Sequence, residues 1–70
     1  LDHKLVSVSV LHPSCGTADG LSTALYVMGP EKGLALANRI NLPVFMIVKS
    51  GDGFKEVVSE SFKPYLKREL

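Results

Sequence analysis

The sequence has no tryptophan, a single cysteine and almost no net charge. Its eight basic and seven acidic side chains leave a formal charge of +1, so charge does not indicate binding to nucleic acid or to an anionic membrane. Cys15 stands alone and cannot form an internal disulfide. No apolar run approaches the roughly 20 residues that span a bilayer, and no stretch is typical of a signal peptide.

The chain is also short. Seventy residues make one domain at most, and they begin at Leu1 rather than at methionine. We therefore expect residues 1–70 to form a single unit of a longer protein. The 46% hydrophobic content is typical of a globular chain. A unit of this size buries only about 60% of its extended surface, so its core is expected to be marginal.

The first half of the chain predicts one strand and two helices. Residues 5–11 alternate valine with serine, which indicates a half-buried strand with the serines on its less buried face. Residues 17–28 predict a helix, with Ser14 or Thr17 as its cap. Gly29 and Pro30 are suited to the end of this helix and the start of a second, which runs to Arg39 or Ile40. The apolar stripe expected to face the core is Ala18, Leu21, Leu25 and Met28.

The second half predicts a hairpin. Residues 44–48 are apolar on both faces, as in a central strand, and residues 50–53 form a turn into a returning strand over 54–59. The tail over 60–70 is expected to pack back before a charged, frayed end. The fold class is therefore α/β (α+β), a small β-α-α-β-β unit with a mixed sheet covered on one face by two helices. The pairing of the first strand stays open.

An acid and a hydroxyl residue lie four positions apart in the first helix. Asp19 and Thr23 therefore share one helix face and present three oxygens side by side. A carboxylate with a neutral oxygen is suited to a hard cation such as Mg²⁺, which takes oxygen ligands. The alternative is structural, because acids and hydroxyls near a helix start commonly cap it and complement its dipole.

Cys15 and His12 offer a second candidate chemistry in the loop before this helix. A thiol near a helix N-terminus can have a lowered pKa, as a nucleophile requires. A catalytic cysteine also needs an oriented base, and no partner is evident because His12 stands at the strand end. We therefore expect Cys15 to be a small, partly buried loop residue.

The wider stretch resembles a known family. Residues 14–34, the strand before them and the ending over 62–66 are similar to the C-terminal signature of the ApbE family of FAD:protein FMN transferases. The family pattern is approximately A-D-A-x-[AS]-T-A-L-x-V-x-G-x-E-K-G, and this chain departs from it at Gly20, where alanine is usual. The resemblance covers nearly the whole chain. It identifies residues 1–70 as a C-terminal fragment of an ApbE-like flavin transferase domain.

The resemblance implies a divalent-cation site, usually for Mg²⁺, with FAD as the substrate. Asp19 and Thr23 match the side-chain metal ligands of the family. Ser22 matches a position that gives a backbone carbonyl, usually from alanine, and a backbone ligand tolerates that change. The family's upstream histidine motif has no match at His3 or His12, so no role is transferred to them. We therefore expect the fragment to be inactive alone.

The activity that the resemblance implies is transfer of FMN from FAD to a threonine or serine hydroxyl of a target flavoprotein subunit in a membrane redox complex. The implied location is the periplasmic side of the bacterial inner membrane, with a lipid anchor upstream of this fragment. Two alternatives stay open. The parent protein could hydrolyse FAD to FMN and AMP, or this unit could be a non-enzymatic interaction module that docks a partner on its apolar sheet face.

Overall fold

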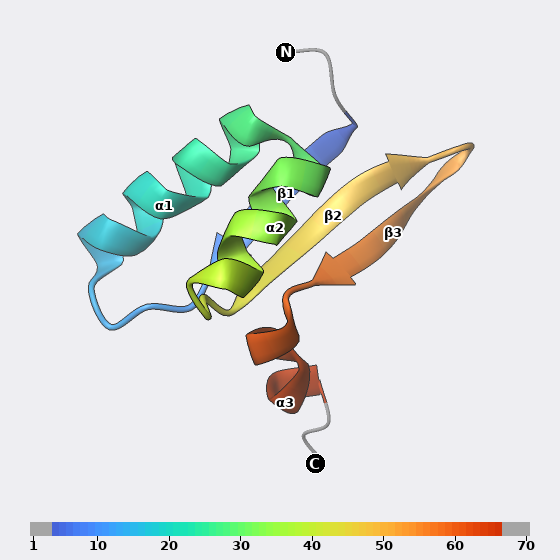
Figure 1. Ribbon diagram of the computed structural model, residues 1–70. Helices are drawn as coiled ribbons and strands as arrows, with labels where there is room; N and C mark the ends of the chain where they lie inside the picture. Colours follow the sequence, from blue (N-terminus) through green and yellow to red (C-terminus); the bar gives the residue numbers. More distant parts are fainter. Residues whose placement is uncertain (1–3, 67–70) are drawn as a thin grey trace.

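The computed structural model describes residues 4–66, in which three strands and two long helices form the predicted β-α-α-β-β order. Expectations for residues 1–3, including His3, and for the end of the tail at 67–70 lie outside the described residues. Figure 1 shows the order of the elements. They are β1 (Leu5–Val10), α1 (Cys15–Met28), α2 (Pro30–Arg39), β2 (Val44–Ser50), β3 (Gly53–Val58), the 3₁₀ turn η1 (Glu60–Phe62) and α3 (Lys63–Leu66).

The three strands form one sheet in the order β1-β2-β3, and both pairs are antiparallel. The expectation of a mixed sheet was therefore wrong. The reason is the pair of helices between β1 and β2. A single crossover helix would return the chain to the same end of the sheet and give parallel strands. Here α1 runs back along the sheet and α2 runs forward again (Figure 1), so β2 enters in the direction opposite to β1.

The register of β1 against β2 contains an irregularity. Leu5 pairs with Val48 and Ser7 with Ile47, so the register shifts between these two pairs. The shift is a β-bulge, in which one extra residue sits between two ladder positions. It leaves Val6 49% exposed, contrary to the buried position that strict alternation predicts. Leu5 takes the buried place instead, at 4% exposure.

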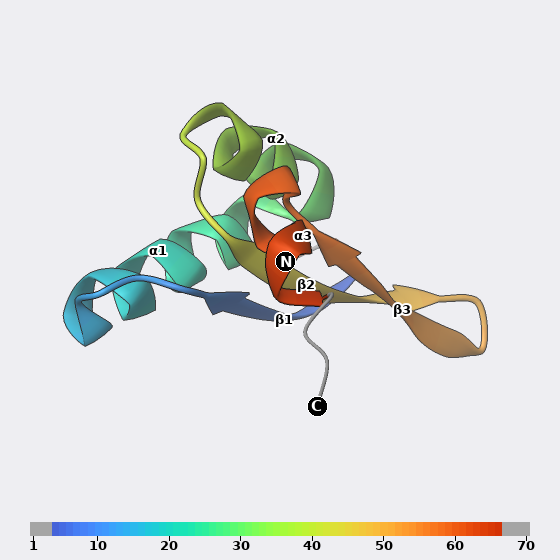
Figure 2. The same ribbon diagram turned by 90° about the horizontal axis from the view of Figure 1, so that it is seen from below.

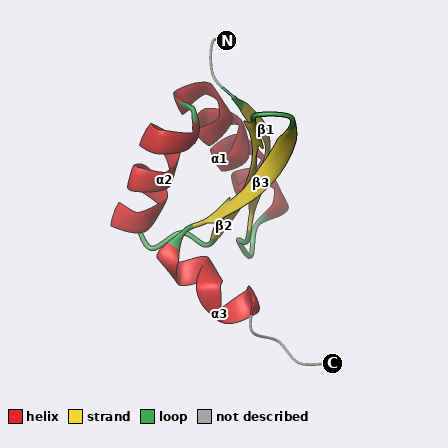
Figure 3. Cartoon of the chain, turned by 90° about the vertical axis from the view of Figure 1, so that its right-hand side faces the viewer, coloured by secondary structure: helices red, strands yellow, loops and turns green. Residues whose placement is uncertain are grey.

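The core lies between the sheet and the two helices. Both α1 and α2 lie on the same side of the sheet (Figures 2 and 3), as predicted. From α1, Leu25 is fully buried, while Leu21 and Ala18 are half-buried. Met28 is 38% exposed, because it ends α1 beside a groove rather than beneath another element. The buried core residues are Leu5, Leu25, Ala37, Leu42, Val44, Met46 and Val48.

The opposite face of the sheet is only partly covered. Ser7 is half-buried and Ser9 exposed, which confirms the prediction that the serines lie on the less buried face. The tail does pack back at one point, where the ring of Phe62 lies 5.6 Å from that of Phe45, between centroids. Phe54 remains 67% exposed at the far end of β3.

Candidate functional site

The start of α1 is fixed by Ser14. Its hydroxyl accepts a hydrogen bond from the backbone N–H of Thr17 at 3.2 Å, and its carbonyl accepts from the N–H of Ala18 at 2.9 Å. Of the two expected caps, Ser14 is therefore the one used, and the helix begins at Cys15, two residues earlier than predicted. Asp19 consequently lies beyond the first turn, which contains no acid. The capping explanation of this carboxylate does not hold.

The three predicted site residues gather on one side of α1. The hydroxyls of Ser22 and Thr23 both donate to the backbone carbonyl of Asp19, at 2.9 Å and 3.0 Å. Each hydroxyl proton is thereby directed inward along the helix, and the oxygen lone pairs remain available as acceptors. The carboxylate of Asp19 is exposed and has no hydrogen-bond or ionic partner among residues 4–66.

These groups are suited to a hard cation but supply only part of a ligand set. Asp19 and Thr23 offer a carboxylate and a hydroxyl oxygen, which are ligand types that Mg²⁺ accepts. The carbonyl of Ser22 lies within a regular helix, where it is aimed at the N–H four residues on and keeps one lone pair. No group of three His, Cys, Asp or Glu residues within 4–66 could hold an ion.

A small hollow adjoins these oxygens. It has a volume of about 210 Å³ and is lined by Val8, Ser22, Thr23 and Tyr26. It therefore lies between the edge strand β1 and helix α1, which places the two hydroxyl residues on its wall. Helical spacing predicts that Tyr26 shares a face with Asp19, Ser22 and Thr23, and Tyr26 does line the hollow beside the two hydroxyl residues.

The loop before α1 contributes structure rather than chemistry. Cys15 is exposed at the first position of the helix, so the expectation of a partly buried residue was wrong. The reason is that helix α1 begins early and carries Cys15 away from the core. The ring of His12 accepts a hydrogen bond from the backbone N–H of Ser14 at its Nδ1, at 3.0 Å. His12 therefore orients the cap residue.

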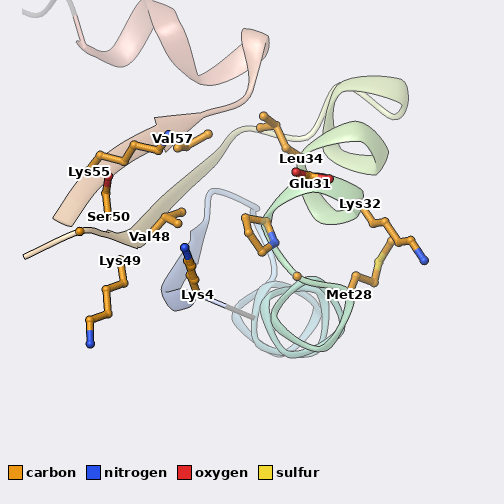
Figure 4. A pocket seen from close by; sticks show the side chains of 13 residues that line it. Lys4, Met28, Glu31, Lys32, Leu34, Val48, Lys49, Ser50, Lys55 and Val57 are labelled. Carbon is orange, nitrogen blue, oxygen red and sulfur yellow. The ribbon is translucent and has the colours of Figure 1, made fainter. Parts of the chain in front are cut away.

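A second and larger hollow lies at the other end of α1. This groove between α2 and the hairpin has a volume of about 710 Å³ (Figure 4). Its apolar surface comes from Val48, Val57, Leu34, Met28 and Pro30, and its charged residues are Lys4, Lys32, Lys49, Lys55 and Glu31. Sequence reasoning missed it, because these residues come from separate segments with no shared spacing.

The sequence model of the ApbE family matches residues 1–46. The FAD:protein FMN transferase of Vibrio cholerae is 56% identical over 68 residues, which are 97% of this chain and 20% of that protein. The FAD:protein FMN transferase of Escherichia coli K12 is 45% identical over 69 residues, which are 99% of this chain and 20% of that protein.

Two solved structures contain the same fold. The flavin transferase ApbE of Vibrio cholerae superposes with a TM-score of 0.87 at 58% identity, over 91% of this chain and 21% of that one. The apo form of the flavinyl transferase ApbE of Pseudomonas stutzeri gives a TM-score of 0.91 at 43% identity, over 100% and 23%. The chain thus spans about a fifth of the length of the relatives it matches.

Proposed function

This chain belongs to the ApbE family, and we propose on that basis that it is part of an FAD:protein FMN transferase. The substrate is FAD and the acceptor is a threonine or serine hydroxyl of a target flavoprotein. The reaction breaks the pyrophosphate of FAD, joins the FMN phosphate to the acceptor oxygen as a phosphoester, and releases AMP and the hydroxyl proton. The activity belongs to the whole protein, of which this chain is about a fifth.

The observation that carries the proposal is the exposed Asp19 carboxylate beside Thr23. Asp19 has no structural partner among the residues described, and it lies too far into α1 to cap the helix. Asp19 and Thr23 lie one turn apart on one face of α1, so the carboxylate and the hydroxyl oxygen can face the same ion. Asp19 and Thr23 would hold a divalent cation, with Mg²⁺ as the family's usual ion and Ser22 as the source of a carbonyl oxygen.

Asp19 and Thr23 would hold the cation, whose charge would offset that of the phosphate oxygens during cleavage of the pyrophosphate. The contribution of this chain is to position the ligands. The hydroxyls of Ser22 and Thr23 are fixed by their bonds to the Asp19 carbonyl, so little side-chain freedom remains to be lost on binding. Asp19 acts as a ligand and not as the base. The phosphates and residues outside this chain complete the set, so the chain alone is expected to bind Mg²⁺ weakly and to be inactive.

We further propose the setting that the family implies. The protein would work on the periplasmic side of the bacterial inner membrane, held by a lipid anchor upstream of this chain, on a subunit of a membrane redox complex. None of the helices in residues 4–66 is long and apolar enough to cross a membrane.

The experiment uses the full-length protein with FAD, Mg²⁺ and a candidate acceptor protein, followed by intact-mass spectrometry. An acceptor that gains the mass of FMN, with AMP released in equal amount, supports a transferase. Release of FMN and AMP without labelling of any acceptor supports the FAD pyrophosphatase. If neither labelled acceptor nor released FMN and AMP is detected, the transferase and the pyrophosphatase are both contradicted, and a non-enzymatic module is favoured.

The Asp19→Ala variant tests the metal role in the same assay. Its far-UV circular dichroism should match that of the wild type, because the side chain is exposed and its carboxylate has no hydrogen bond or ion pair among residues 4–66. Asp52→Ala is the matched control, since Asp52 is an exposed acid in the hairpin turn. Labelling that is lost only in Asp19→Ala supports the proposed ligand, and labelling that survives in it contradicts the assignment.

A further inference from the structure

The groove between α2 and the hairpin concentrates positive charge. Half of the eight basic residues of the chain line it, against the single carboxylate of Glu31, although the whole chain has a formal charge of only +1. All four lysines are exposed. Low-dielectric walls focus the field of such charges and attract an anionic partner.

The lysines are spread along the groove rather than gathered at one point. In Figure 4 Lys4 and Lys55 point toward the groove, whereas Lys32 and Lys49 point outward from its opposite sides. A phosphate needs donors that converge on one position. A chain of carboxylates spaced along a backbone fits a distributed set of cations better.

The surface between the lysines is apolar. Val48 is buried beneath it, and the half-buried side chains of Leu34 and Val57 form facing walls from α2 and β3. A ligand with charged groups but no apolar groups would leave this apolar surface in contact with water. A polypeptide segment that alternates acidic with apolar side chains would pair with both parts.

Lysine is depleted from the buried parts of protein interfaces, and charges at an interface rim act mainly by steering association. The lysine-lined groove therefore favours a partner that binds and leaves over a segment packed there permanently. In a transferase that partner is the acceptor. The groove lies at the opposite end of α1 from Asp19, about 14 Å along the helix axis, so it is separate from the proposed cation ligands.

We propose that this groove docks an acidic, apolar segment of the protein that receives FMN, with Lys4 and Lys55 pairing with its carboxylates. The inference rests on the proposed function for the identity of the partner. It predicts that the groove selects acceptors by their charge, while Asp19 and Thr23 would hold the cation used in the transfer.

The test measures binding to the full-length protein without FAD, so that catalysis is not involved. Two fluorescein-labelled synthetic peptides serve as probes. Each has one central threonine with leucine and valine flanks, and one carries aspartates where the other carries asparagines. By fluorescence anisotropy we expect the aspartate peptide to bind about tenfold more tightly at low salt, with a preference that weakens as salt is added.

Charge reversal locates the site. The pair Lys4→Glu and Lys55→Glu should reduce the preference to about twofold or less. The control pair Arg39→Glu and Lys63→Glu changes the net charge by the same amount at exposed positions outside the groove. This control should keep the preference for the aspartate peptide. If the variant with Lys4→Glu and Lys55→Glu does not fold, the single Lys55→Gln change should still weaken the preference for the aspartate peptide.

Three results would overturn the proposal: equal binding of the two peptides, equal loss in the control pair, or no binding at all. In the last case carbodiimide cross-linking identifies what fills the groove instead. A link from Lys55 to an acid elsewhere in the same polypeptide indicates the protein's own chain, and a link to a second copy indicates a dimer. The Lys63–Glu60 pair, 2.9 Å apart, is the positive control for cross-linking. Release of AMP from FAD by the wild type tests the proposed function separately.

Discussion

The hydroxyl of Ser59 accepts a hydrogen bond from the backbone N–H of Val44 at 2.9 Å and donates to the carbonyl of Leu42 at 2.7 Å. Ser59 is fully buried, and its own N–H donates to the Val44 carbonyl at 3.0 Å. One side chain thus satisfies two buried backbone groups where β2 begins and β3 has just ended. The Ser59→Ala change should lower the free energy of unfolding by about 1–3 kcal/mol, because both groups lose their partner.

Urea denaturation of the full-length protein measures this loss. Ser9→Ala is the matched control, because Ser9 is exposed on the other face of the sheet and should change stability by about 0.5 kcal/mol or less. If both variants unfold at the same urea concentration as the wild type, the bonds of Ser59 contribute little.

Two glycines should respond in opposite ways to alanine. A Cβ at Gly20 would meet nothing within 4 Å, so Gly20→Ala should stabilise α1 by about 0.5–1 kcal/mol through helix propensity. A Cβ at Gly33 would lie 3.1 Å from the backbone oxygen of Leu25 and 3.2 Å from the terminal methyl of Met46. The backbone atom cannot move aside cheaply, so Gly33→Ala should destabilise the protein. Thermal unfolding gives the melting temperature of each variant. A higher melting temperature in both variants than in the wild type would contradict the tight packing of α1 on α2.

The cap of α1 gives a third prediction. Ser14→Ala removes the oxygen that accepts from the Thr17 N–H and should cost about 0.5–2 kcal/mol. Thr17→Ala changes a residue of similar type that is inside the helix and does not cap it, so it should cost little or slightly stabilise. Differential scanning calorimetry distinguishes the two, and an equal loss in both would mean that Ser14 is not the cap.

Thr23 should tolerate serine but not valine. Thr23→Ser keeps the hydroxyl, while Thr23→Val keeps the shape and removes the oxygen. With the proposed cation site, we expect Thr23→Val to lower FMN transfer about 100-fold or more at limiting Mg²⁺, with partial recovery at high Mg²⁺. Stability should be almost unchanged, because the side chain is exposed and threonine and valine have similar helix propensities. Transfer by Thr23→Val at the wild-type rate would exclude this oxygen as a ligand.

The sequence was most informative where local chemistry decides. The apolar run over Val44–Val48 predicted a central strand, and the Ser50–Gly53 stretch predicted the hairpin; both are confirmed. Gly29 ends α1 with a φ of 88°, and Pro30 follows as the first residue of α2, as their types predicted. The central strand, the hairpin and the junction of the two helices all depend on contacts between residues close in the chain. A sequence pattern can predict such contacts.

Features that depend on distant contacts were missed. The bulge that exposes Val6 depends on how β1 meets a strand more than thirty residues away, and valine–serine alternation contains no sign of it. The groove is another case, because it forms only when Lys4, the end of α1, α2 and the hairpin meet. Helix α1 began early because Ser14 and Thr17 are equally good cap types, and only the path of the loop selects between them. The role of the site residues Asp19, Ser22 and Thr23 stays a prediction.

The central position of β2 has a consequence for how this unit is made. Among residues 4–66 both of its neighbours pair only with β2, so no strand pair within this unit can form before residues 44–50 exist. During synthesis β1 and both long helices precede the strand of this unit with which β1 pairs, and Leu5 and Leu25 lack their core neighbours Val44, Met46 and Val48 until β2 follows. A ribosome that stalls before residue 44 would therefore release a chain that exposes its core and invites chaperones or proteases.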